Sequence, residues 1–509
     1  MWESPESFLA RLKELPCALQ GEPEPTEAGK REPLWRMAHL YVVRNVFICL
    51  LAREPIALSI WTGISVGVAV HLFTQVPPMY ILFSMPLLVP LLIGWVMFTA
   101  LFLPPGSQCR TMRLRKDIVC EPGLYAKSGG IGEKLLKRLP QWYHDNLEKN
   151  ITPWIVSGEA YTMLPYLSAT FAKMWGDIDQ TYRRVWIKAL GEDQSTKMPL
   201  ETEDGEVLST DWAFPKQGHD PSAPVLIILH GLNGGSRSPF VRDIAKKCVK
   251  KGWTAVCFSG RGIGGLPCYK YPFHGARIAD LHLVAGVVRK LCPNSLVVAC
   301  GFSMGGIIVG NYLSRMGQSA LVDGVVNVAG CIDINHSSKF DYCHETFTPL
   351  ITHGLKMSML LGGKFTDVAK RVNVDMDFAL SSKCCSLTDF DTHIARKVAG
   401  YSCVEDYYDA LSVVSIDEKS INFKNKKWLT VARPMLVVMS LDDVVVDVNH
   451  LVGHHDKNPN FAFLITRYGG HCGWPTGWWP WTDGFSKQSH FVLDFVEALK
   501  AEKGSEGRS

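Results

Sequence analysis

The stretch SLVVACGFSMGGIIVGNYL, residues 295–313, places a serine between two apolar segments. Residues 295–300 are of strand type, whereas the residues from Gly306 onward can form a helix. Between them lies the pattern Gly-x-Ser-x-Gly at 301–305, whose glycines allow a sharp turn from strand to helix. Such a turn holds a serine hydroxyl out at the carboxyl edge of a sheet. We therefore predict that Ser303 is a catalytic nucleophile.

The same pattern occurs a second time, at 63–67, in a different setting. Ser65 lies in the middle of a long apolar run with no turn on either side, so no base is expected to reach it. Two glycines four residues apart also allow membrane helices to approach closely. We interpret this match as helix packing.

Apolar strands and helical patterns alternate around the serine turn. Helical patterns at 240–251 and 278–291 separate several of the strands. Strands that are apolar throughout belong to a parallel sheet covered on both faces, so the sequence predicts an α/β fold. The predicted strands are 225–229, 254–258, 324–329, 434–439 and 461–465.

Two later strand ends carry an acid and a base. Asp443 follows the strand at 434–439, and His471 follows the strand at 461–465. Serine, then acid, then histidine is the chain order of the α/β-hydrolase fold. In that arrangement His471 takes the proton of Ser303, and Asp443 orients the imidazole. The neighbouring Asp442 is an alternative acid, for which we favour a turn-capping or supporting role.

The loop HGLNGG at 230–235 follows the first strand. In this fold that loop provides one amide of the oxyanion hole, and the residue after the nucleophile provides the other. We therefore predict that the backbone N–H groups of Leu232 and Met304 stabilise the negative oxygen of a tetrahedral intermediate. His230, which precedes the loop, is predicted to be structural.

Several of these segments together resemble the YheT-like α/β hydrolases, which include membrane-bound abhydrolase-domain lipases of animals and fungal medium-chain ethyl-ester synthases. The resemblance covers roughly residues 150–500 and implies phospholipids and monoacylglycerols as substrate classes. Ile307 and Val444 depart from the pattern, where the family often has Asn and Pro, but neither replaces a catalytic group. The similar segments are HGLNGGSRS at 230–238, RG at 261–262, GFSMGG at 301–306, GYS at 400–402, DYY at 406–408, DD at 442–443 and YGGH at 468–471.

The strand pattern stops between residues 331 and 431. This stretch is partly helical, and Met357 and Leu360 belong to an apolar cluster within it. We predict a largely helical lid inserted over the site, with an apolar face that lines an acyl pocket. The alternative is a surface insertion with an ordinary packing role.

Two long uncharged runs near the N-terminus predict a membrane anchor. A helix needs about 20 apolar residues to cross a bilayer, and the runs at about 56–74 and 79–103 approach or exceed that length. A Pro pair between them predicts a turn, so the segment 36–116 is expected to form a helical hairpin. Basic residues at both ends of it predict a cytosolic catalytic domain. A shallow re-entrant or single-span arrangement is one alternative, and buried core helices are another.

The composition excludes several other classes of protein. The formal net charge of the 509 residues is only +4, which does not fit a nucleic-acid-binding surface. The 15 cysteines are scattered, as in a reduced intracellular protein, and no paired CxxC or HExxH pattern indicates a metal site. No cofactor is expected, and the sequence gives no oligomeric state.

These observations predict an integral membrane enzyme that cleaves carboxylic esters of bilayer lipids, and the anchor and the free cysteines suggest the endoplasmic reticulum. The alternatives are an acyltransferase that makes esters from an alcohol, and a non-catalytic membrane-anchored binding protein. The predicted layout is a polar segment at 1–35, the anchor at 36–116, the catalytic domain at 117–500 and a polar tail at 501–509.

Overall fold

The computed structural model describes sixteen parts of the chain, and the segments between them are not discussed further. The described residues are 2–21, 119–149, 161–162, 182–193, 196–232, 234–263, 266, 268–339, 351–352, 355–356, 366–381, 383–384, 386–414, 427–451, 453–476 and 486–506.

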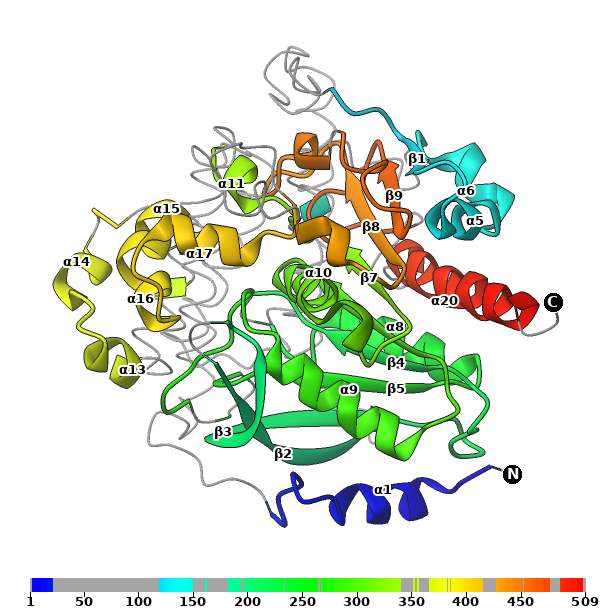
Figure 1. Ribbon diagram of the computed structural model, residues 1–509, viewed down its shortest axis with the longest axis horizontal. Coiled ribbons are helices and arrows are strands. Elements are labelled where there is room, and N and C mark those ends of the chain that lie inside the picture. The colour runs from blue at the N-terminus through cyan, green and yellow to red at the C-terminus, as the bar shows by residue number, and fades with distance from the viewer. Residues whose placement is uncertain are drawn as a thin grey trace, which may run out of the picture.

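A nine-stranded sheet with the order β1-β9-β8-β7-β6-β4-β5-β3-β2 forms the centre of the molecule (Figure 1). The six strands from β9 to β5 are parallel to their neighbours, whereas β1, β3 and β2 pair antiparallel at the two edges. The predicted mostly parallel α/β-hydrolase sheet is therefore confirmed. The strands are β1 Gly123–Ala126, β2 Tyr182–Glu192, β3 Pro199–Ala213, β4 Val225–Leu229, β5 Thr254–Ser259, β6 Val297–Phe302, β7 Gly324–Val328, β8 Met435–Ser440 and β9 Phe461–Thr466.

Helices cover both faces of this sheet. The connection from β4 to β5 and the connection from β5 to β6 run in opposite directions across the sheet, so right-handed crossovers place their helices on opposite faces. α8 (Pro239–Lys250) contacts α20 (Ser486–Glu506) on one face, and α9 (Ala279–Leu291) contacts α10 (Met304–Met316) on the other. Every residue of the six parallel strands is buried as a result.

Short helices occupy the described parts of the insertion between β7 and β8, and Figure 1 shows most of them gathered at one side of the sheet. They have an apolar core of their own, to which Val368, Phe390 and Ile394 belong. Leu232, from the loop after β4, packs against that core. The helices are α11 Ile334–Ser337, α13 Thr366–Arg371, α14 Met376–Leu380, α15 Leu387–Phe390, α16 Arg396–Val398 and α17 Val404–Leu411.

The N-terminal residues pack on the hydrolase domain. Helix α1 (Pro5–Lys13) begins at Ser4, whose side chain accepts a hydrogen bond from the Ser7 N–H group. Its apolar side is fully buried at Phe8 and Leu12. The chain then bonds to β2, where the Leu19 N–H group donates to a carbonyl 2.9 Å away.

The C-terminal helix differs from the prediction for the tail. Residues 501–509 were expected to be a polar tail, but α20 continues to Glu506. Polar side chains of this last part are held by partners elsewhere in the fold. Glu502 pairs with Arg138 at 2.6 Å, and Lys503 pairs with Asp323.

The predicted membrane hairpin, 36–116 with spans at 56–74 and 79–103, lies outside the described residues. Among the helices of the described part of the chain, none has the length and apolar character required to cross a bilayer. Two helices follow this segment in the sequence, α5 Ile131–Lys137 and α6 Gln141–Asn146.

Candidate active site

Ser303 stands on a strained turn between β6 and α10. Its backbone has φ 51° and ψ −114°, a conformation that residues other than glycine rarely adopt. The flanking glycines make the turn possible: a Cβ on Gly301 would lie 2.1 Å from the Gly305 carbonyl oxygen, and one on Gly306 would lie 2.1 Å from Oδ1 of Asn327. The Ser303 N–H group donates to the Val328 carbonyl at 2.9 Å, which ties the turn to β7. The predicted strand–turn–helix context of the serine is present.

The three residues predicted to act together are brought together. Nε2 of His471 lies 2.8 Å from Oγ of Ser303, and Nδ1 of His471 lies 2.9 Å from Oδ2 of Asp443. The side chain of Asp443 is fully buried, and that of His471 is 5% exposed. These contacts join residues 168 and 28 positions apart in the sequence.

The hydrogen bonds around Asp443 determine how the imidazole is held. The backbone N–H groups of Val445 and Val446 donate to Oδ1 of Asp443 at 2.8 and 2.9 Å, which fixes the orientation of the carboxylate and turns Oδ2 toward the ring. Oδ2 therefore accepts from Nδ1–H of His471 and leaves Nε2 free to accept the hydroxyl proton of Ser303. This tautomer is the one that a general base next to a serine requires.

Asp442 has a different position from Asp443. Its Oδ1 accepts a hydrogen bond of 2.8 Å from the backbone N–H of Gly470, next to the histidine, whereas Asp443 contacts the ring itself. Burial raises the pKa of Asp442 to about 7. The structure thus separates two carboxylates that the sequence left as alternatives.

The loop after β4 lies directly against the nucleophile. A Cβ on Gly231 would be 3.3 Å from Cβ of Ser303. His230 supports this loop: its Nε2 accepts from the Gly260 N–H at 3.2 Å, so Nδ1–H donates to the Gly231 carbonyl at 2.7 Å. Burial lowers the pKa of His230 to about 4, which keeps it neutral and suits the predicted structural role.

Leu232 and Met304, the two predicted oxyanion-hole residues, are each adjacent in the chain to a residue of this contact between Gly231 and Ser303. Leu232 follows Gly231 in the loop, and Met304 is the first residue of α10. At a helix start the backbone N–H groups have no intrahelical partner and can bind an anion. Their assignment to the oxyanion hole stays a prediction.

Two side chains that the sequence did not indicate also reach the histidine loop. Oγ1 of Thr162 accepts from the His471 N–H at 2.8 Å, and Gln488 of α20 donates to the carbonyls of Cys472 and Gly473. Neither residue belongs to a motif, and no sequence signal could have identified them.

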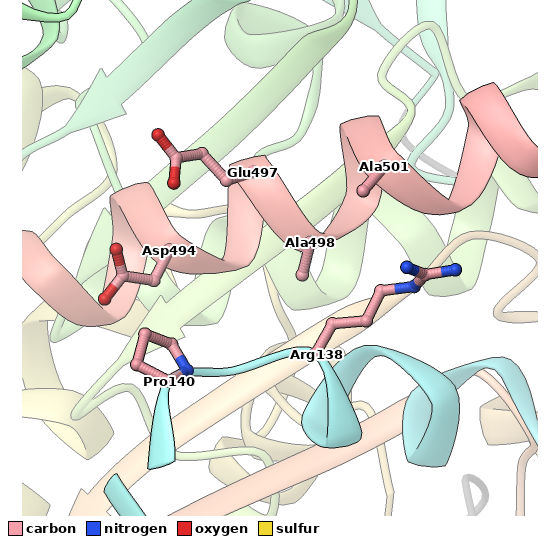
Figure 2. A pocket seen from close by; sticks show the side chains of 6 residues that line it. All are labelled: Arg138, Pro140, Asp494, Glu497, Ala498 and Ala501. Carbon is pink, nitrogen blue, oxygen red and sulfur yellow. The ribbon is translucent and has the colours of Figure 1, made fainter. Parts of the chain in front are cut away.

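A pocket of about 410 Å³ lies elsewhere, between α20 and the turn from α5 to α6 (Figure 2). Charged side chains line it together with small ones, and none of the predicted site residues is among them. Its lining residues are Arg138, Pro140, Asp494, Glu497, Ala498 and Ala501. Within the described parts of the chain, no group of His, Cys, Asp and Glu side chains could hold a metal ion.

Comparisons with known proteins support the α/β-hydrolase fold. Residues 224–473 match the sequence profile of the alpha/beta hydrolase fold. Phospholipase ABHD3 of Homo sapiens is 26% identical over 347 residues, which cover 64% of this chain and 77% of that protein. The monoacylglycerol lipase of Saccharomyces cerevisiae is 27% identical over 270 residues, which cover 51% and 57%. YheT of Escherichia coli is 22% identical over 280 residues, which cover 55% and 78%. The chain is an α/β-hydrolase enzyme and is similar in sequence to the YheT-like members of that group.

Proposed function

We propose that this enzyme hydrolyses carboxylic esters of membrane lipids through an acyl-enzyme on Ser303. The observation that carries the proposal is the 2.8 Å contact between Nε2 of His471 and Oγ of Ser303. A serine hydroxyl is a weak nucleophile until a base accepts its proton, and this contact provides the base.

The reaction follows from the positions of these groups. As Oγ of Ser303 attacks the ester carbonyl, His471 takes the hydroxyl proton and Asp443 stabilises the imidazolium. The predicted Leu232 and Met304 amides stabilise the oxyanion, and collapse of the intermediate releases the alcohol after His471 protonates it. Water then attacks the acyl-enzyme with His471 again as base, which releases the acid and restores Ser303.

Three observations support a lipid substrate. Relatives of this chain bear the names phospholipase and monoacylglycerol lipase. Leu232, which follows Gly231 in the loop against the nucleophile, packs against the apolar core of the insertion, as expected of a lid next to an acyl site. The uncharged runs at 56–74 and 79–103 would anchor the enzyme in the bilayer that contains its substrate, with the catalytic domain in the cytosol. The endoplasmic reticulum is our proposed membrane.

Fluorophosphonate labelling of the full-length protein in membranes tests the nucleophile. We expect wild type to be labelled and Ser303→Ala to show no label. His471→Ala and Asp443→Asn should label far more slowly, whereas Asp442→Asn should retain most of the rate. Labelling of Ser303→Ala at the wild-type rate would show that another residue reacts.

A product assay with phospholipid and monoacylglycerol vesicles then tests the reaction. Free fatty acid as the main product, with or without added alcohol, supports hydrolysis. Ester formation that dominates when alcohol is added would instead identify an acyltransferase, and a folded wild type without any label would favour a binding protein.

A further inference from the structure

We propose that Thr162 and Asp442 are positioning residues for His471, and that Thr162 acts from outside the region that matches the hydrolase profile. The inference rests on the proposed function, because it assigns His471 as the base. It extends the proposed function by naming the side chains that fix the position of the imidazole.

The loop that carries His471 has an unfavourable backbone. Gly470, Cys472 and Trp474 have φ values of 58°, 57° and 45°, and the last two are not glycines. Left-handed conformations in side-chain-bearing residues persist only where the surroundings impose them. The position of His471 must therefore be fixed by contacts made from outside the loop.

Side chains from separate parts of the chain make those contacts on the backbone next to the imidazole. Gly470 is held on both sides: its carbonyl accepts from Oγ of Ser440 at 3.0 Å, and its N–H donates to Oδ1 of Asp442 at 2.8 Å. The N–H group of His471 itself donates to Oγ1 of Thr162 at 2.8 Å. Gln488 completes the set at the next two carbonyls.

Thr162 is the most informative of these residues. It is 3% exposed and stands beside Tyr161, whose carbonyl oxygen would be 2.3 Å from a Cβ on Gly473. The two chain segments thus approach so closely that only glycine fits. Residues 161–162 precede the matched region, 224–473, by about 60 positions. A domain that began at residue 224 would therefore lack a side chain that bonds to the backbone of the base.

A small displacement is enough to matter for catalysis. The imidazole must stay at hydrogen-bond distance from both Ser303 and Asp443, and a shift of about 1 Å in such a group can cost about 100-fold in rate. Removing the acceptor from Thr162 leaves the buried N–H of His471 without its partner, so the loop must move or open.

Thr162→Val in the full-length protein removes the hydroxyl and keeps the shape of the side chain. We expect kcat, and the rate of fluorophosphonate labelling, to fall about 10- to 100-fold with KM little changed. Thr162→Ser restores the acceptor and should stay within about threefold of wild type. A matched control is Thr210→Val, at another buried threonine. Oγ1 of Thr210, in β3, donates to the Val185 carbonyl of β2 at 3.1 Å. The control should lower Tm without lowering kcat of the folded enzyme.

Asp442 provides a second, independent arm. Asp442→Asn keeps an oxygen that accepts from the Gly470 N–H, whereas Asp442→Ala does not. We expect Asp442→Ala to lose about tenfold or more in kcat, and Asp442→Asn to recover most of it. Wild-type rates in both Thr162→Val and Asp442→Ala would overturn the proposal, and so would failure of Thr162→Ser and Asp442→Asn to recover activity.

An NMR measurement separates this proposal from the proposed function. In protein with labelled histidine, the proton that Nδ1 of His471 shares with Asp443 should give a downfield resonance. We expect Thr162→Val to shift or broaden it and Thr162→Ser to keep it, even in an enzyme that turns over no ester. An unchanged resonance in Thr162→Val would refute the positioning role, whereas absent labelling of wild type would refute only the proposed function.

Discussion

At the scale of single residues, the direction of the hydrogen bond between Asp443 and His471 determines which ring nitrogen of the histidine carries the proton. Asp443→Asn preserves an acceptor for Val445 and Val446 but presents an NH₂ group to Nδ1. The ring proton of the imidazole must then be carried by Nε2, and this nitrogen can no longer accept the hydroxyl proton of Ser303. We expect kcat to fall about 10³- to 10⁴-fold with Tm little changed, measured by ester hydrolysis at neutral pH and thermal melting. A loss of less than tenfold would argue against this tautomer.

Asp442 predicts a pH dependence of stability at the same scale. Burial raises its pKa to about 7 from an ordinary value of 3.8, so between these limits the folded protein holds a proton that the unfolded chain has released. The stabilisation is therefore fully present below about pH 4 and is lost as the pH rises through 7. Thermal melts from pH 4.5 to 7.5 should show a smaller loss of Tm in Asp442→Asn than in wild type. Parallel curves would contradict a raised pKa.

At the scale of elements, two helical glycines should respond oppositely to the same substitution. Gly306, in the first turn of α10, leaves no room for a Cβ next to Asn327, whereas a Cβ on Gly286 in α9 would make an ordinary 3.6 Å contact with Leu321. We expect Gly306→Ala to lose about 1–3 kcal/mol or more and Gly286→Ala to gain about 0.5–1 kcal/mol. Urea unfolding measures both. A Gly306→Ala variant as stable as wild type would mean that the turn at Ser303 is packed less tightly than the distances to Asn327 indicate.

The elements that could be predicted from sequence are those with their own local pattern. The buried parallel strands carry unbroken apolar runs, and Ser303, Asp443 and His471 follow the ends of such strands, so chain order alone brings them to one edge. The edge strand β2 alternates between buried and partly exposed residues, and β1 is only four residues long, so neither has such a run. Thr162 and Gln488 reach the histidine loop through contacts that only the folded chain defines.

At the scale of the whole molecule, α1 is part of the hydrolase domain although it precedes the predicted anchor. The ring of Phe8 lies 5.2 Å from those of Trp212 and Phe214, and it is fully buried. Phe8→Ala should cost about 3–5 kcal/mol, whereas Glu6→Ala, on the exposed side of the same helix, should cost little. Both variants should keep wild-type kcat once folded, because α1 packs on the far edge of the sheet from β1 and β9. Equal stability of the two variants would show that α1 is not docked.

The same arrangement determines how the predicted membrane anchor can be tested. Residues 17–19 bond to β2, whereas β1, which follows the predicted anchor in the sequence, lies at the opposite edge of the nine-stranded sheet. Strands lie about 4.8 Å apart, so a replacement for 36–116 must cross about 40 Å. A flexible connection of about 50 residues, made of the retained flanks and a Gly/Ser linker, has about that root-mean-square span.

We expect the variant with this connection to leave the membrane fraction, to melt like wild type and to keep its fluorophosphonate reaction, while wild type resists carbonate extraction. A variant that stays in the pellet would show that residues outside 36–116 bind the bilayer. A shorter linker of about 20 residues should lower Tm, because α1 or β1 must then detach from its edge of the sheet.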